Sequence, residues 1–171
     1  MTTLKKFRWI WGWDDEKEEA WLREMAQQGW HMSAASHAPW YVFEQGEPRD
    51  VVYRIDFHTT GKGNADYLQL FEDAGWEHVG ENLGWQYFRQ PVRDGRSPEI
   101  FTDNESKVQK YERLLALLVA LLPLYIPLSM IDTHRLWIEV VGVAFLLLYI
   151  GFLAFAFSSL IMRIRQLKRR F

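Results

Sequence analysis

The chain has 171 residues, which is room for one small folded domain and a pair of membrane helices. It contains no cysteine, which excludes disulfides, thiolate catalysis and Cys-ligated zinc. Residues 1–112 hold 13 Lys and Arg against 20 Asp and Glu, a net charge of −7. We therefore expect no nucleic acid partner, because duplex affinity comes mostly from neutralising phosphates.

The first predicted element is a strand over residues 5–13. Phe7, Trp9 and Trp11 alternate with Arg8 and Ile10, which is the period of a strand with two different faces. We assign the three aromatic residues to the core face and the other two to the opposite face.

A helix is predicted next, over residues 14–28. Acidic residues crowd its first turns, where the helix dipole favours negative charge, and an apolar stripe runs along one side. The stripe consists of Trp21, Leu22, Met25 and Ala26. Gly29 then predicts a left-handed helix stop, with Trp30 lying over Met25 as in a Schellman motif.

The same order of elements recurs 46 residues later. Short strands over 31–35 and 40–45 end the first half, and a strand over 51–57 opens the second half. A helix over 64–74 follows, then the stop at Gly75 and Trp76, and strands near 77–80 and 85–89. The shift pairs Phe7 with Tyr53. We predict an α+β cytoplasmic domain over residues 1–91, a duplicated β-α-β-β module with repeats at 5–46 and 51–91. Its antiparallel sheet would carry both helices on one face.

The remainder of the chain predicts a membrane hairpin. Residues 92–101 form a turn-rich linker, and residues 102–171 follow with a juxtamembrane helix, two apolar spans at about 114–131 and 137–162, and a basic tail. Basic residues flank both outer ends of the hairpin, whereas the loop holds only Arg135. A multi-pass cell membrane protein with both termini cytoplasmic is therefore predicted.

Three segments resemble a known family. Residues 52–57 (VYRIDF), 67–77 (YLQLFEDAGWE) and 85–91 (WQYFRQP) are similar to the bacterial membrane proteins with domain of unknown function 2812. The resemblance implies a cytoplasmic Gly-Trp-containing domain followed by membrane helices, in a regulatory setting and with no known activity. The strand-helix-strand-strand order also resembles, more weakly, the GyrI-like effector-binding domains, which hold amphipathic compounds in an aromatic cleft with an acid.

No catalytic, metal or cofactor site is predicted. The five histidines show no H-x-x-x-H spacing, and Gly61-Lys62-Gly63 lacks the phosphate-loop pattern. Ser33, Ser36 and His37 lie close in sequence, but without the glycine context of a nucleophile elbow. We expect a protein that is not an enzyme and has no cofactor.

Strand alternation divides the remaining aromatic and charged residues between two faces. With the helices we place Tyr41, Phe43, Tyr53, Ile55, Phe57 and Phe88. On an open face we place Arg8, Trp40, Glu44, Arg54, Asp56, Trp85, Tyr87 and Arg89. Trp40, Trp85 and Tyr87 would form the walls of a ligand or partner surface, with polarity set by Asp56 and Glu44. The alternative is that a second copy or the juxtamembrane helix covers this face.

Two functions fit these patterns. The first is a membrane-tethered regulatory or protein-interaction module, in which the partner is another protein or a second copy. The second is a membrane-tethered receptor for a small amphipathic or cationic ligand. A flat, open sheet face would favour the module, and a closed aromatic cleft with an acid at its base would favour the receptor.

Overall fold

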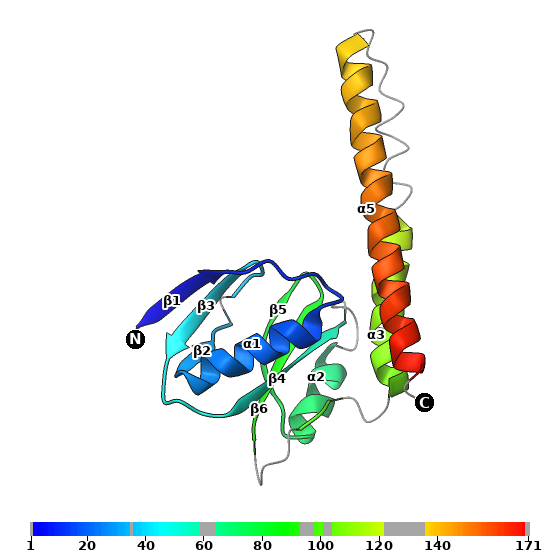
Figure 1. The fold of residues 1–171 in the computed structure, drawn as a ribbon. Helices are drawn as coiled ribbons and strands as arrows, with labels where there is room; N and C mark the ends of the chain where they lie inside the picture. Colours follow the sequence, from blue (N-terminus) through cyan, green and yellow to red (C-terminus); the bar gives the residue numbers. More distant parts are fainter. Residues whose placement is uncertain are drawn as a thin grey trace. The chain divides into compact units, whose positions relative to one another are not determined.

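A computed structural model describes residues 2–34, 36–58, 64–92, 98–100, 104–121 and 136–169 (Figure 1). The chain divides into two units, which we call the folded unit (Met1–Thr102) and the helical unit (Asp103–Phe171).

The folded unit alternates strands and helices as predicted. In chain order it contains β1 (Thr3–Phe7), α1 (Asp15–Gln27), β2 (Trp30–Met32), β3 (Trp40–Gln45), β4 (Val51–Phe57), α2 (Asn64–Asp73), β5 (Glu77–Asn82) and β6 (Trp85–Pro91). The strands form two three-stranded antiparallel sheets, sheet A in the order β1-β3-β2 and sheet B in the order β4-β6-β5. The fold class is therefore α+β, but with two sheets in place of the one predicted.

The first strand is shorter than its alternating pattern predicts. β1 ends at Phe7, and Trp9 lies beyond the sheet with 61% of its surface exposed. Phe7 is itself 57% exposed, so the prediction that these two residues belong to the core is wrong. Trp11 is half-buried because its ring stacks on Trp13 at a centroid distance of 5.1 Å. In the sequence, apolar and polar residues continue to alternate beyond Phe7. The partner strand β3 begins opposite Phe7, however, so residues 8–13 have no strand beside them to pair with.

Strand registers also differ from the predicted alignment of the two halves. β1 places Phe7 opposite Trp40, and β4 places Phe57 opposite Trp85. Tyr53 lies opposite Arg89, four residues before Phe57, so the predicted pairings of Phe7 with Tyr53 and of Trp40 with Trp85 do not hold together. Part of this offset arises because α1 begins 14 residues before its glycine stop, whereas α2 begins 11 residues before its own.

One core joins α1 to the inner faces of both sheets. It contains Trp21, Leu22, Met25 and Ala26 from α1, Met32, Tyr41 and Phe43 from sheet A, and Val51, Tyr53, Ile55, Val79 and Tyr87 from sheet B. Trp21 makes edge contacts with the rings of Tyr41 and Phe43 at centroid distances of 5.0 and 5.5 Å. The apolar stripe predicted for the first helix is thus confirmed as its buried face.

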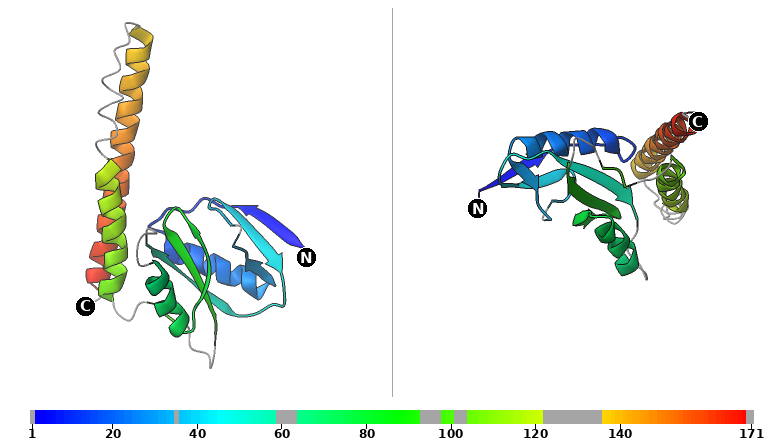
Figure 2. Two further views of the ribbon diagram at one scale, coloured as in Figure 1. Left: turned by 180° about the vertical axis from the view of Figure 1, so that it is seen from behind. Right: turned by 90° about the horizontal axis from the view of Figure 1, so that it is seen from below.

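A second cluster lies on the opposite face of sheet B, beneath α2. It contains Val52, Phe71, Trp76 and Phe88. The two helices therefore pack against opposite faces of sheet B (Figure 2), and the prediction that both cover one face is wrong. The reason is that β4 is buried on both faces: Val52 faces α2 while Ile55 faces α1, and each is 1% exposed.

Both predicted glycine stops are confirmed. Gly29 has a φ of 83° and Gly75 a φ of 85°, in the left-handed region that favours glycine. After α2, the amide of Gly75 donates to the carbonyl of Glu72, and the amide of Trp76 donates to the carbonyl of Phe71, which is the Schellman pattern. After α1, the amide of Gly29 donates to the carbonyl of Ala26 at 3.0 Å.

The helical unit contains α3 (Asn104–Leu121) and α5 (Leu136–Lys168). The start of α3 packs against the end of α5, where Arg163 Nε lies 3.3 Å from the Tyr111 hydroxyl and Lys168 Nζ lies 3.8 Å from Glu112. Most of the remaining surface of α5 is apolar and exposed, with Phe145 66% and Leu148 70% exposed.

One helix in the described part of the chain, Val141–Lys168, is long and apolar enough to cross a membrane by length and composition. This supports association with a membrane. It does not support a multi-pass arrangement. The first predicted span, 114–131, falls partly in α3, and its second half, with the predicted loop, lies outside the described residues.

Candidate docking surface

Sheet A has one buried face and one open face. In antiparallel pairs, directly opposed residues lie on the same face, so Thr3, Lys5 and Phe7 of β1 share a face with Glu44, Val42 and Trp40 of β3. We call these six residues the open face. Five of them are exposed and Val42 is half-buried, whereas the alternate residues Tyr41 and Phe43 are buried under α1.

Aromatic rings dominate one end of the open face. Phe7 and Trp40 meet edge to face with their centroids 4.8 Å apart, and they are 57% and 62% exposed. Trp9 follows in the chain and touches the Trp11 ring at 5.5 Å. Large aromatic side chains gathered on a surface in this way usually mark an interaction site.

A hairpin tip adjoins this aromatic end. Leu83 lies between β5 and β6 with 86% of its surface exposed and a φ of 50°, and Gly84 has a φ of 85°. The Asn82 side-chain amide donates to the carbonyl of Ala38 at 3.5 Å, which attaches the tip to the segment leading into β3. Arg8, Trp9, Ile10, Ala38, Pro39, Asn82, Leu83 and Trp85 line a hollow of about 170 Å³ there.

Four of the eight predicted surface residues lie in this region. Trp40 and Glu44 are on the open face, and Arg8 and Trp85 line the hollow. The Arg8 amide donates to the carbonyl of Pro39 at 2.9 Å, which ties the segment after β1 to the start of β3.

The other four lie elsewhere, so the eight do not form one surface. Asp56 and Tyr87 are each 3% exposed, and their predicted placement on an open face is wrong. The register explains Tyr87, because it lies opposite Ile55 on the face that α1 covers. Asp56 lies on the α2 side of sheet B, where it accepts hydrogen bonds from the Tyr67 hydroxyl at 2.9 Å and from the Phe57 amide at 2.8 Å.

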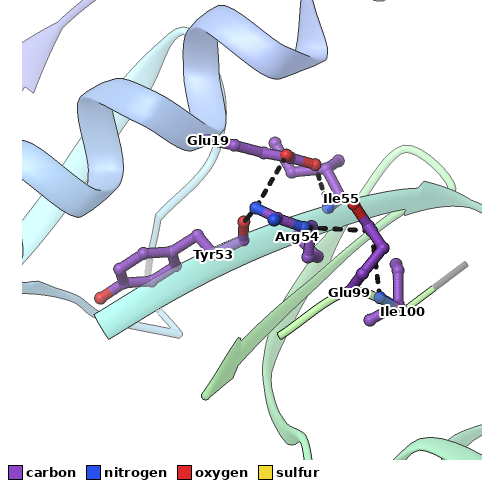
Figure 3. A network of polar contacts seen from close by, with 6 residues as sticks. All are labelled: Glu19, Tyr53, Arg54, Ile55, Glu99 and Ile100. Carbon is purple, nitrogen blue, oxygen red and sulfur yellow. Dashed lines mark hydrogen bonds and ion pairs between the residues drawn. The ribbon is translucent and has the colours of Figure 1, made fainter. Parts of the chain in front are cut away.

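Arg54 ties α1 to the edge of sheet B (Figure 3). Its guanidinium donates to Glu19 at 3.2 Å and to Glu99 at 3.1 Å, and also to the carbonyl of Tyr53. Glu19 in turn accepts the amide of Ile55 at 3.0 Å. These side chains satisfy outward-pointing backbone groups of the edge strand β4, which protects it from pairing with another strand.

Arg89 has a structural partner on sheet B. Its Nε donates to Glu77 at 2.8 Å, directly across the β5–β6 pair. It also lines a hollow of about 330 Å³ with His31 and Glu44, whose lining is mixed in charge. In the portion of the chain that the structure describes, no three His, Asp or Glu side chains gather closely enough to hold a metal ion.

One buried carboxylate, Glu18, lies outside the predicted set of site residues. Glu18 is 8% exposed and accepts hydrogen bonds from the Tyr41 hydroxyl at 2.5 Å and the Tyr87 hydroxyl at 2.9 Å. Burial raises the pKa of the Glu18 carboxyl above its usual range, although the two phenol hydrogen bonds oppose the rise. Spacing could have revealed it, since Glu18 lies three and four residues before Trp21 and Leu22, on the buried stripe.

The comparisons with known proteins give a family. A sequence model of the family described as "Protein of unknown function (DUF2812)" matches residues 14–122, from α1 through α3 and more than half of the chain. No curated protein and no solved structure matched the chain. The resemblance drawn from residues 52–57, 67–77 and 85–91 is confirmed, and the likeness to GyrI-like domains is not. The chain belongs to the family of proteins of unknown function, DUF2812.

Proposed function

We propose that this protein is a membrane-tethered, non-enzymatic module with a regulatory or interaction role. The apolar part of α5 would hold it in the bilayer, and the folded unit would dock on a partner through the open face of sheet A. The observation that carries the proposal is the exposure of Phe7, Trp9 and Trp40, each more than half accessible to solvent on a domain that has a separate, well-packed core.

The alternative, a receptor for a small amphipathic ligand, has less support. A receptor would need an aromatic cleft with an available acid, and the acid among the core aromatics, Glu18, is already engaged by two tyrosines. The hollow beside Trp9 holds about 170 Å³ and has Arg8 as its charged lining residue. Drug-sized ligands usually occupy roughly 300–1,000 Å³.

The finer architecture is part of the proposal. The two sheets have equivalent strand orders, β1-β3-β2 and β4-β6-β5, each with a helix after its first strand, which supports a duplicated β-α-β-β module. We also propose that the helices form a two-span hairpin with both termini cytoplasmic. The basic residues at the end of α5 support this orientation.

The tether predicts a position-dependent effect of charge in α5. Leu148→Lys places a charge in the middle of the apolar stretch, where insertion is costly, so alkaline washing should release much of this variant from membranes. Met162→Lys is the matched control, because a lysine beside Arg163 can extend to the interface. Equal retention of the two variants in the pellet would contradict the tether.

The docking role predicts protection of the open face in membranes. Thr3→Cys adds a single thiol to this cysteine-free chain, on an exposed residue of the open face. In membrane fragments, where the thiol reagent reaches both sides, alkylation of this cysteine should be slower than in detergent, because the docked partner limits the access of the reagent to the open face. Gln69→Cys, on the exposed side of α2, should react at the same rate in both. Unchanged alkylation at position 3 would count against docking through this face.

A further inference from the structure

We propose that an extended segment of a partner protein adds to sheet A as a further strand, beside β1. The surface that it uses is the outer edge of β1, which pairs only with β3 in the described part of the chain. This inference rests on the proposed docking role and names how the partner binds: through its backbone, in an extended conformation, next to the open face.

The first argument is the direction of the backbone groups of β1. In an antiparallel pair, residues that exchange hydrogen bonds with the other strand alternate with residues whose N–H and C=O point away from it. The amide of Arg8 donates to the carbonyl of Pro39 at 2.9 Å, so the even-numbered residues of β1 face β3. The outward groups belong to Thr3, Lys5 and Phe7. All three residues are exposed, and none of the described residues bonds to these backbone groups.

The second argument is that the other edges of the two sheets are protected. On β4, the side chains described above occupy outward backbone groups. On β2, the outward amide of Met32 donates to the Tyr53 hydroxyl at 3.2 Å, and Arg89 lies 3.5 Å from the carbonyl of Met32. β5 has a bulge between His78 and Gly80, which interrupts its edge. An unprotected edge is a template for pairing with another chain, and β1 offers one.

Lys5 argues against a second copy of this chain as the added strand. If two β1 strands paired antiparallel with all their outward residues engaged, Thr3 would lie opposite Phe7, and Lys5 would lie opposite Lys5 of the other copy. Like charges directly opposite each other are destabilising, and lysine on an edge strand is a known device against self-pairing. Lys5 therefore disfavours self-association and leaves the edge open to a strand of a different protein.

The side chains beside the edge specify the partner further. In an added antiparallel strand, directly opposed residues lie on the same face, with their Cβ atoms about 4.5–5.5 Å apart. A residue opposite Phe7 would lie beside the rings of Phe7 and Trp40, whose centroids are 4.8 Å apart. An apolar residue fits there, and an acidic or uncharged residue fits opposite Lys5. The backbone bonds would supply affinity, and these two positions would supply selectivity.

The test uses the full chain in its native membrane, with the photo-crosslinking residue benzoylphenylalanine in place of Thr3 or of Phe7. Both positions lie at the ends of β1 and on the open face. Mass spectrometry identifies the residue of the partner that each probe reaches. For an added strand, we expect both probes to reach one segment of a single protein, at residues about four positions apart, because paired strands advance residue by residue.

A pair of variants at Lys5 tests the backbone bond itself. Lys5→Pro removes the outward N–H, and Lys5→Thr is the matched control, because it removes the same ammonium group but keeps the N–H. Pairing of β1 with β3 does not use this N–H, and proline is tolerated on edge strands when its nitrogen faces outward. The yield of the crosslink from position 7 should be about fivefold lower in Lys5→Pro than in Lys5→Thr. If Lys5→Pro fails to fold, the spacing of the two crosslinks decides by itself.

Other results would overturn the inference in distinguishable ways. Crosslinks to scattered residues of a protein, or equal yields in folded Lys5→Pro and Lys5→Thr, would keep docking through the open face but exclude an added strand. Crosslinks to β1 of a second copy would show that the partner is this chain itself. The absence of protein crosslinks from both positions would overturn the docking role as well.

Discussion

Substitution of Gly29 by alanine should destabilise the folded unit by about 2–4 kcal/mol, because two costs act together. At a φ of 83° any residue with a Cβ is strained, and that Cβ would lie 2.8 Å from the carbonyl oxygen of Gly46. Gly46 cannot easily move, since its amide donates to the carbonyl of Gly29 at 2.9 Å. Eight of the nine tryptophans lie in the first 85 residues, so tryptophan fluorescence during urea unfolding in mild detergent reports on this unit.

Gly75→Ala is the matched control. Its φ of 85° gives the same backbone strain, but the new Cβ would meet only the side-chain amide of Gln90, at 2.8 Å. A side-chain end can rotate away, so a loss of about 1–2 kcal/mol is expected. If Gly75→Ala cost as much as Gly29→Ala, or if neither variant lost stability, the account of the two helix stops would be wrong.

Removal of either tyrosine hydroxyl that donates to Glu18 should cause the second large loss of stability. Tyr41→Phe and Tyr87→Phe each remove one hydrogen bond to a buried carboxyl group, which is worth about 1.5–3 kcal/mol when the acceptor is charged. Urea unfolding of the full chain near neutral pH, followed by tryptophan fluorescence, measures the loss. No loss in either variant would mean that Glu18 does not depend on these partners.

The buried Glu18 carboxyl also predicts the direction in which the free energy of unfolding changes with pH. Burial raises the pKa of Glu18 in the folded state, so the folded state binds this proton more tightly than the unfolded chain. The resulting stability is fully present below the ordinary glutamate pKa and is lost as the pH rises through the raised folded pKa. Across this window the free energy of unfolding should fall by up to about 1.4 kcal/mol per pH unit relative to Glu18→Gln.

Glu18→Gln removes the titrating group and leaves the rest of the helix unchanged. A wild-type curve that runs parallel to that of Glu18→Gln would contradict the assignment of a raised pKa to Glu18. Asp15 and Arg8 also act on this carboxyl, the first raising and the second lowering its pKa, and both remain in the wild type and in the variant.

The candidate docking surface could be predicted only in part from the sequence. Alternation correctly separated Trp40 and Glu44 from Tyr41 and Phe43 on β3, because a strand must point successive side chains to opposite faces. It misplaced Tyr87, because alternation does not say which of two faces is covered. On β6 both faces are covered: Phe88 is buried under α2 and Tyr87 under α1.

Leu83 and Glu18 show the two kinds of information that were missing. In the sequence, Leu83 is an ordinary apolar residue before a glycine. Its φ of 50° and its high exposure are visible only in the structure. In the sequence, Glu18 is one of several acidic residues at the start of a helix. Only the packing of β3 and β6 against α1 brings the hydroxyls of Tyr41 and Tyr87 to it. Both features depend on contacts between segments far apart in the chain.

Local sequence patterns were sufficient to predict the helices, their glycine stops, the strands β3 and β4, and the apolar character of α5. Each of these depends on interactions within a few residues, such as the spacing of apolar side chains or the strain of a left-handed residue. The division into two sheets, the placement of α2 on the far face of sheet B, and the exposure of Phe7 and Trp9 came from the tertiary structure alone. The register of strand pairing decides these, and a register is a set of long-range contacts that no local period encodes.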